Sequence, residues 1–129
     1  MKALSLTQPW ATLVATGRKK VETRSWSTNY RGLLYVHAAK GFPAYARRFA
    51  EEEVGIDGCP GAYPRGVIIA RVRLVDIQRT EKVISKLSAL EKHYGDYSPG
   101  RFAWFLEDAE KLLSPIPYRG SLGLFDVEE

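Results

Sequence analysis

Alternation of apolar and polar residues along the chain predicts six strands. Side chains on a strand point to opposite faces in turn, so an alternating pattern indicates a strand with a buried face. We expect strands at residues 1–6, 20–26, 33–38, 66–78, 102–106 and 123–127. Leu34, Val36 and Ala38 share one face of the third strand. The opposite face, which carries Leu33 and Tyr35, is also apolar enough to predict burial on both sides.

The strand at residues 66–78 has the strongest pattern. Its residues Ile69, Arg71, Arg73 and Val75 are expected to face the same way. Apolar residues also occur in the opposing register, and this mixture of patterns indicates a long strand that bends.

Apolar spacing and capping signals predict three helices between the strands. They are expected at residues 8–16, 43–53 and 81–92. Thr7 is expected to cap the first helix, Pro9 to lie in its first turn and Gly17 to end it. Thr80 is expected to cap the third, which carries an apolar stripe that includes Val83.

Glycine and proline residues mark the connections, and the order of the elements indicates the fold class. Residues 54–65 and 95–100 are expected to be loops, and residues 115–117 (Pro-Ile-Pro) to join the last two strands. Strands and helices do not alternate regularly, which favours an α+β fold. We therefore predict a small mixed β-barrel or rolled sheet with about three flanking helices. A length of 129 residues fits one domain.

Composition excludes several classes of protein. Hydrophobic residues make up 45% and charged residues 26%, as in soluble globular proteins. No apolar run approaches the ~18 residues of a membrane span, and the N-terminal run is too short for a signal peptide. We therefore expect a cytoplasmic protein without a membrane partner. Cys59, the single cysteine, excludes an internal disulfide, and the spacing of His37 and His93 fits no metal site, so no metal or cofactor is expected.

Positive charge is concentrated at the start of the chain. Residues 1–48 contain nine Lys or Arg residues and one acid, Glu22, which gives a net charge of +8. The remaining residues contain ten positive and fourteen negative side chains, a net charge of −4. A one-sided positive field attracts nucleic acids and nucleotides, although a lopsided solvated surface would have the same composition.

Residues 17–26 are the densest group of candidate functional side chains. Strand alternation places Lys20, Glu22, Arg24 and Trp26 on one face, while Lys19 lies at the corner before the strand. A lysine beside a carboxylate can transfer a proton or bind an oxyanion. An arginine can bind a phosphate or a base edge, and a tryptophan can stack on a base. The alternative is an ion pair on a sheet surface beside core aromatic residues.

Three other positions could contribute to a site. His37, near Lys40 at the end of a strand, could titrate near neutral pH or simply form structural hydrogen bonds. Arg101, in a glycine-flanked loop, suits a phosphate contact, although the segment also fits a surface loop followed by a core strand. The helix start at Gln8 and Trp10 could offer backbone N–H groups to an anion or be an ordinary helix start with a core tryptophan. The chain has neither a glycine-rich phosphate loop nor a nucleophile elbow.

Four segments carry a family pattern. They read LSLTQPWATLVATGRKKVETRSW, YRGLLYVHAAK, GDYSPGRFAWFLED and PIPYRGSLGLFDV. Over nearly the whole chain they resemble the ASCH domain family, named for homology to activating signal cointegrator-1. The most specific parts are Gln8-Pro9-Trp10, Lys19-x-x-Glu22-x-Arg24 and Tyr30-Arg31-Gly32. The resemblance implies a single domain over residues 1–129 with a PUA-like fold, a small β-barrel with flanking helices.

The resemblance also implies a binding cleft near the first helix and the following strand. The expected partner is RNA, another single-stranded nucleic acid or a modified nucleoside, in RNA metabolism or regulation. The implied ligand-binding residues are Gln8, Trp10, Lys19, Glu22, Arg24, Trp26, His37 and Arg101.

Some members of the family are enzymes, which leaves a second interpretation. One bacterial group hydrolyses N4-acetylcytidine with a Lys-x-x-Thr-x-Arg run and a later Glu. Aligned on Arg24, that lysine falls on Lys19 and the threonine on Glu22, so the nucleophilic hydroxyl is missing. Thr23 is one residue later, in a register that loses the arginine match and turns the side chain to the other face. The later Glu matches either Glu81 or Glu91.

The alternative function is thus a metal-independent hydrolase that acts on a modified nucleoside or on RNA. Lys19 and Glu22 would be its catalytic residues. Ribonuclease activity has also been associated with the family. A third possibility, suggested by the family name, is a protein-interaction domain of a co-regulator.

Overall fold

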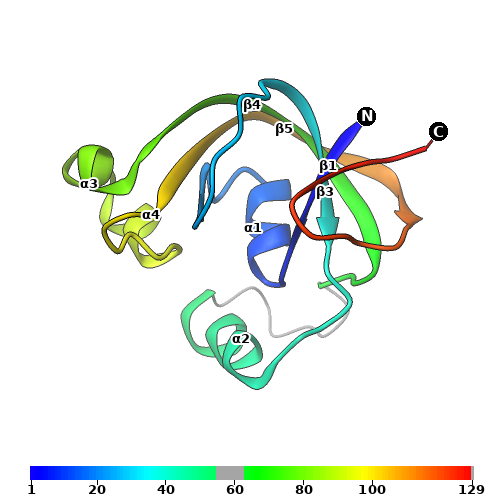
Figure 1. Ribbon diagram of the computed structural model, residues 1–129. Helices are drawn as coiled ribbons and strands as arrows, with labels where there is room; N and C mark the ends of the chain where they lie inside the picture. Colours follow the sequence, from blue (N-terminus) through cyan, green and yellow to red (C-terminus); the bar gives the residue numbers. More distant parts are fainter. Residues whose placement is uncertain (55–62, 129) are drawn as a thin grey trace.

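A six-stranded mixed sheet curls around one side of the molecule in the computed structural model, which describes residues 1–54 and 63–128 (Figure 1). Its strands are β1 (Lys2–Leu6), β2 (Val21–Arg24), β3 (Gly32–Ala38), β4 (Val67–Arg79), β5 (Phe102–Pro117) and β6 (Leu124–Asp126). Their order is β2-β5-β4-β3-β1-β6. β1 and β3 are parallel and the other neighbours are antiparallel. The predicted α+β class is confirmed, and the rolled sheet is a curled half-barrel.

The long pair β4 and β5 gives the sheet its curvature. Their pairing shifts register three times, between Ile68 and Ala70, between Arg71 and Arg73, and between Leu74 and Asp76. Each irregularity bends the strand and increases its twist. The predicted long, bent strand at 66–78 is therefore confirmed to within one residue.

The predicted assignment of β4 residues to one face is wrong for Ile69, because the pairing of β4 with β5 is bulged. Arg73 and Val75 are exposed and Arg71 is partly exposed, but Ile69, predicted to share their face, is buried. The register shift between Ile68 and Ala70 interrupts the strict alternation at this point. A period of two applies to a strand only where its ladder is regular.

The main core lies between the concave face of the sheet and α1 (Trp10–Ala15), which occupies the inside of the arch (Figure 1). Leu34, Val36 and Trp104 are almost completely buried there. Five of the six α1 residues are buried. Helices this short are marginal in isolation, so packing against the sheet holds α1 in place.

The prediction that β3 is buried on both faces is wrong at its start. Leu34 and Val36 are buried, but Leu33 on the opposite face is 37% exposed. Further along this face, Tyr35 packs in the same cluster as Val127 and Phe125, and His37 contacts Phe125, so residues near the C-terminus cover the middle and far end of β3. The sequence pattern could not show that the cover is partial.

The first two helices form where expected, although the first start signal differs. Thr7 does not cap α1 with its side chain; instead, Oε1 of Gln8 accepts the N–H of Thr12 at 2.9 Å. Thr7 contributes only its backbone carbonyl, which accepts the N–H of Ala11. The predicted helix at 43–53 is α2 (Ala44–Phe49) continued by a π-helix (Ala50–Val54).

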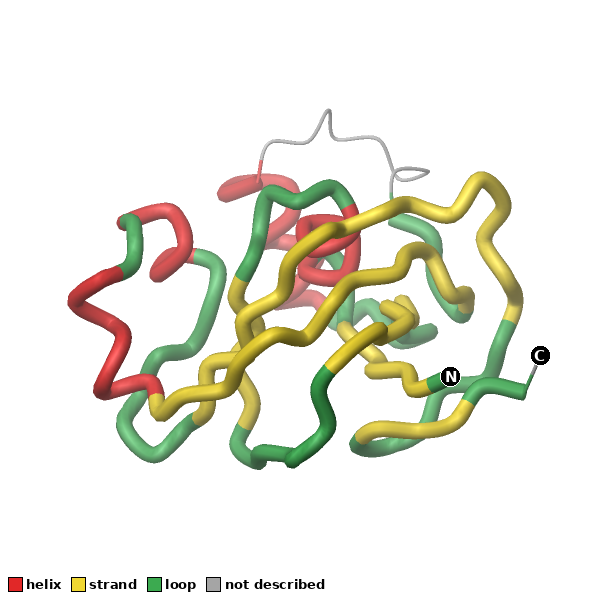
Figure 2. The backbone as a smooth tube through the Cα atoms, turned by 90° about the horizontal axis from the view of Figure 1, so that it is seen from above, coloured by secondary structure: helices red, strands yellow, loops and turns green. Residues whose placement is uncertain are grey.

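The predicted helix at 81–92 is two helices, so the described residues form four α-helices rather than three. α3 (Thr80–Val83) runs into a 3-10 turn (Ile84–Lys86), and α4 (Ala89–His93) follows. Oγ of Ser88 accepts the N–H of Glu91 and so caps α4. The capping serine interrupts the apolar stripe. Figure 2 shows both helices at the end of the sheet far from the termini.

The predicted ends of two strands, β5 and β2, differ from the observed ends. β5 continues to Pro117, so residues 115–117 belong to it rather than linking two strands. β2 pairs with β5 only over residues 102–105, and the later part of β5 has no partner on that edge among the described strands. Proline is tolerated on such an edge because no ladder hydrogen bond is lost. β2 itself ends at Arg24, two residues before the predicted end at Trp26.

Replacing a core leucine should measure how strongly this packing stabilises the fold. Leu34 is 1% exposed, so Leu34→Ala should lower the free energy of unfolding by about 2–5 kcal/mol. Leu113→Ala is the matched control, because Leu113 is fully exposed and its loss should change stability by less than about 0.5 kcal/mol. Urea unfolding followed by fluorescence measures both. Equal effects would contradict the assigned core.

Candidate functional site

A buried ion-pair network lies where α1 leads into β2. The side chain of Lys19 is completely buried; its Nζ donates to the carbonyl of Val21 and lies 3.2 Å from Oε1 of Glu22. Nη1 of Arg24 lies 3.7 Å from Oε2 of the same carboxylate. Nη2 of Arg24 donates to the carbonyl of Ser5 at 2.8 Å. The carboxylate is therefore fixed between two cations, which compensate its charge.

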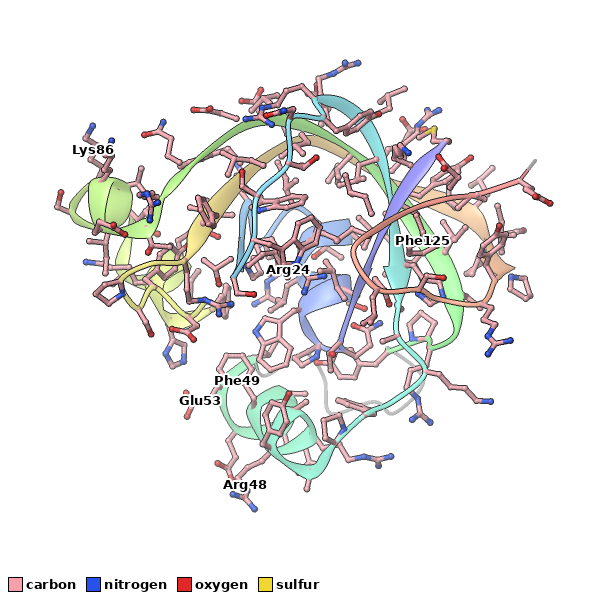
Figure 3. All side chains as sticks on the ribbon, in the orientation of Figure 1. Arg24, Arg48, Phe49, Glu53, Lys86 and Phe125 are labelled. Carbon is pink, nitrogen blue, oxygen red and sulfur yellow. The ribbon has the colours of Figure 1, made fainter. Side chains whose placement is uncertain are left out.

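Glu22 lines a small cleft of about 330 Å³, here called the Glu22 cleft. The other lining residues are Thr7, Trp10, Thr23, Arg24, Phe49, His93, Tyr94, Gly95 and Asp96. Trp10 stacks on Phe49 with ring centroids 5.2 Å apart, which gives the cleft an aromatic side. Figure 3 shows Arg24 between the curled sheet and the helical segment that carries Phe49.

A hydrogen bond joins two helical segments beside this aromatic side. Nε2 of His93 on α4 lies 3.0 Å from Oε2 of Glu53 in the π-helix. The His93 ring also packs against Phe49, with centroids 5.5 Å apart. These contacts hold α4 against the segment that continues α2.

The loop after α4 is fastened to β2 and forms another wall of the cleft. Arg101 donates to the carbonyls of Thr23 at 3.2 Å and Asp96 at 3.1 Å. Oγ1 of Thr23 accepts the N–H of Asp96 at 3.2 Å. Hydrogen bonds from the hydroxyl and the N–H of Ser98 hold the pKa of Asp96 below its usual value. Asp96 is therefore a carboxylate at neutral pH.

A larger depression of about 1220 Å³, here called the basic groove, adjoins the Glu22 cleft. Thr7 and Arg24 line both. The other residues of the groove are Ser5, Trp26, His37, Ala39, Lys40, Arg65, Gly66, Pro117, Tyr118, Arg119, Gly120, Ser121, Leu122 and Gly123. Four of the lining residues are cations and, within the described ranges, none is an acid.

Arg24 is the residue at the junction of the two depressions. Its side chain is 25% exposed. Within the described part of the chain, its Nε–H is buried and has no hydrogen-bond partner. A buried polar group without a partner is uncommon in folded proteins, and such groups occur at functional sites. The junction is therefore suited to an anionic group.

His37 supports one wall of the basic groove. It is 1% exposed; its Nδ1 accepts from the hydroxyl of Ser5 at 2.9 Å, and its Nε2–H donates to the carbonyl of Tyr118 at 2.7 Å. This tautomer is assigned from the hydrogen-bond network. A Cβ on Gly120 would lie only 2.8 Å from Cε1 of His37, so the loop needs glycine there. The geometry agrees with the structural alternative considered for this histidine.

The structure separates the eight expected ligand-binding residues into two groups. Those that line the cleft or the groove are Trp10, Glu22, Arg24, Trp26 and His37. The other three, Gln8, Lys19 and Arg101, lie outside both linings.

Each of these three residues holds part of the site in place. Gln8 is completely buried and donates from Nε2 to the carbonyl of Pro64 at 2.8 Å. Lys19 pairs with Glu22, and Arg101 fastens the loop that follows α4. Their side chains contact other parts of the protein rather than lining either depression.

Arg65 and Arg119 are site residues that the sequence reasoning missed. Both are exposed cations of the basic groove. One signal was available for Arg119, because Tyr118-Arg119-Gly120 repeats the triplet Tyr30-Arg31-Gly32. Arg65 had no comparable signal, since only the pairing of β3 with β4 brings it beside Lys40, whose carbonyl it binds at 3.3 Å.

The two candidates for a later catalytic glutamate lie outside the Glu22 cleft. Glu91 accepts the backbone N–H groups of Lys20 and Val21 at 2.9–3.3 Å. Glu81 accepts the N–H of Gly100 at 3.2 Å, and backbone hydrogen bonds to its carboxylate lower its pKa. Both residues therefore hold neighbouring segments together.

Two features are absent from the described residues. These residues contain no group of three or more His, Cys, Asp and Glu side chains placed to share a metal ion. Nor do they include a helix long and apolar enough to cross a membrane. Cys59 lies outside the described residues.

Removing one charge of the buried pair should destabilise the fold. Lys19→Met leaves Glu22 without its buried cation, and we expect the free energy of unfolding to fall by about 3–5 kcal/mol. Lys20→Met, one position along on the exposed surface, should change it by less than about 0.5 kcal/mol. The double variant Lys19→Met with Glu22→Gln should regain part of the loss because neither charge is left alone. Urea unfolding of the wild type, Lys19→Met, Glu22→Gln alone, the double variant and the Lys20→Met control measures this coupling; additive effects would contradict it.

Comparisons with known proteins agree with this architecture. The model of the ASCH domain family matches residues 4–116. Activating signal cointegrator 1 of Mus musculus and that of Homo sapiens are each 27% identical over 134 residues. The match covers 97% of this chain and 22% of each relative, so the chain spans about a fifth of their length.

The fold also matches solved structures. The crystal structure of ASCH from Zymomonas mobilis has a TM-score of 0.64 and 18% identity, covering 99% of this chain and 87% of that one. Two mutants of the Zymomonas protein have TM-scores of 0.63 and 0.62. At this level of identity the likeness shows a shared fold.

Proposed function

This chain belongs to the ASCH domain family, and we propose that it binds RNA through the basic groove and the Glu22 cleft. The family has a PUA-like fold and is associated with RNA binding. We place this binding in RNA metabolism or regulation. A modified nucleoside, the other expected ligand, would use the same cleft.

The composition of the basic groove carries the proposal. Four separate segments supply its cations: Arg24 from β2, Lys40 after β3, Arg65 before β4 and Arg119 after β5. The described lining of the groove contains no acid, and Glu22 of the adjoining cleft lies 3.7 Å from Arg24. Cations arranged in this way suit a chain of phosphates, whose binding releases condensed counterions. The groove's volume of about 1220 Å³ also exceeds that of most small-molecule pockets, which favours a polymer.

Aromatic side chains beside these cations favour single-stranded RNA. Trp26 is partly exposed in the groove, and Trp10 lines the Glu22 cleft. Stacking of a base on an aromatic side chain contributes ~1–3 kcal/mol, and it requires bases that are not already paired in a helix. The Glu22 cleft, with a volume of about 330 Å³, is suited to a single base.

The geometry favours binding over the hydrolase alternative. Lys19, its suggested catalytic lysine, is completely buried and paired with Glu22. Thr23 already accepts a hydrogen bond from Asp96, and its hydroxyl has no lysine or histidine partner among the described contacts. An activated nucleophile needs a base within hydrogen-bond reach, and the described cleft offers none to Thr23. No specific observation favours the protein-interaction alternative.

Salt dependence tests the proposed function. Binding of a fluorescein-labelled, mixed-sequence RNA of about ten nucleotides should weaken steeply between about 50 and 200 mM salt. Arg65→Gln with Arg119→Gln removes two groove cations, so the log–log slope should fall by about 1.4, at about 0.7 per phosphate on single strands. Fluorescence anisotropy provides the affinities.

The matched control is Arg71→Gln with Arg73→Gln. These arginines are 42% and 49% exposed on β4 and line neither depression. The control should bind RNA with the wild-type slope. An affinity that does not change with salt, or an equal loss in the control, would place RNA outside the basic groove.

A second experiment separates binding from hydrolysis. Purified protein incubated with N4-acetylcytidine and with RNA should leave both unchanged by mass spectrometry, because Thr23 has no base as a hydrogen-bond partner among the described residues. Glu22→Gln is the control for any product. Deacetylated nucleoside or cut RNA that disappears in this variant would make the protein a hydrolase.

A further inference from the structure

We infer that the Glu22 cleft selects guanine, and that the carboxylate of Glu22 accepts the N1–H and the 2-amino group of that base. This inference rests on the RNA binding proposed above and gives it a base preference.

The carboxylate has acceptor sites left for a ligand. An ionised carboxylate offers about four lone-pair sites on its two oxygens. Lys19 uses one site on Oε1, at 3.2 Å, and Arg24 lies 3.7 Å from Oε2, beyond ordinary hydrogen-bond distance. The side chain is 11% exposed and lines the cleft. Each oxygen can therefore accept one further hydrogen bond.

Only one of the four RNA bases presents two adjacent donors on its Watson–Crick edge. Guanine has N1–H beside its 2-amino group. Adenine and cytosine place a ring-nitrogen acceptor beside their amino group, and uracil places a carbonyl on each side of its N–H. An ionised carboxylate only accepts, so it binds guanine by two parallel hydrogen bonds and meets a repelling acceptor on the other bases.

The ion-pair network makes a carboxylate compatible with a polyanion. An isolated acid in the cleft would repel the phosphates in the neighbouring groove. Here Lys19 and Arg24 compensate the charge of Glu22 from two sides. Arg24 also lines the basic groove, so a single residue adjoins both the base and the phosphate.

The surroundings of Glu22 favour a flat ring. Trp10 and Phe49 form the aromatic side, with their ring planes 28° apart. The cleft's volume of about 330 Å³ lies at the lower end for small-molecule sites, which fits one base. Asp96 provides a second carboxylate on another wall, and it adds to the preference for donor-rich bases.

A set of short RNAs that differ in one base tests the inference. Fluorescein-labelled oligouridines carrying a single central guanine, adenine, cytosine or hypoxanthine are compared with all-uridine RNA by anisotropy on the full chain. The guanine RNA should bind about 10-fold to 100-fold more tightly than the adenine or cytosine RNA. Hypoxanthine keeps N1–H but lacks the 2-amino group, so its affinity should fall between them.

Glu22→Gln should abolish the guanine preference, because the amide replaces one acceptor oxygen with a donor. Glu110→Gln is the matched control, since that carboxylate is exposed and lines neither depression. Thermal melting checks that each variant is folded. If Glu22→Gln unfolds, the double variant Lys19→Met with Glu22→Gln also removes the buried lysine charge that would be left without a partner. Independently of any variant, the hypoxanthine RNA tests the hydrogen bond of the 2-amino group on the wild-type protein.

The outcomes separate the two proposals. Equal, salt-dependent binding of all the RNAs would overturn the guanine preference and leave RNA binding intact. A preference that survives in Glu22→Gln would overturn the role of this carboxylate. Binding to none of the RNAs would overturn both proposals.

Discussion

The buried ion pair of Lys19 and Glu22 is the constraint on which the rest of the site depends. The Lys19 side chain has no exposed surface, so its charge must be compensated inside the protein. Glu22 is the single acid among the first 48 residues and supplies that compensation. Because Glu22 also pairs with Arg24, the requirement to neutralise one buried lysine fixes both side chains that meet at the cleft. The same ion pairs therefore stabilise the corner between α1 and β2 and fix the positions of the side chains at the cleft.

The sheet topology brings the basic groove together from distant parts of the sequence. β1 pairs with β3 on one side and with β6 on the other. The loop before β6 thus comes to lie beside the end of β3, where His37 binds Tyr118 and packs on Gly120. A histidine held by both ring nitrogens is a rigid support, and it keeps the loop that carries Arg119 facing the groove.

The sequence was sufficient for the fold class and for the approximate positions of the six strands, but not for all of their ends or for the groove. Local alternation located β1, β3 and the start of β5, because their buried faces are continuous. It could not show that β5 extends to Pro117, since that half is exposed and is defined by its pairing with β4. The apolar stripe from Val83 onward indicated one helix, whereas Ser88 divides it by capping α4. Arg65 joins the groove through a tertiary contact that no local pattern records.

The spacing of Lys19, Glu22 and Arg24 has a geometric reason. Residues two apart on a strand share a face, so Glu22 and Arg24 point to the same side of β2. Lys19 is three positions before Glu22, outside the strand, and the turn after α1 is what directs it to the same carboxylate. Lys20, directly before the strand, has the period of two for this face, yet it is exposed. The run therefore builds one acceptor with two compensating cations, and only Arg24 among the cations also reaches the groove. Under the proposed function, Glu22 and Arg24 would contact the base and the phosphate, and Lys19 would hold Glu22 in place.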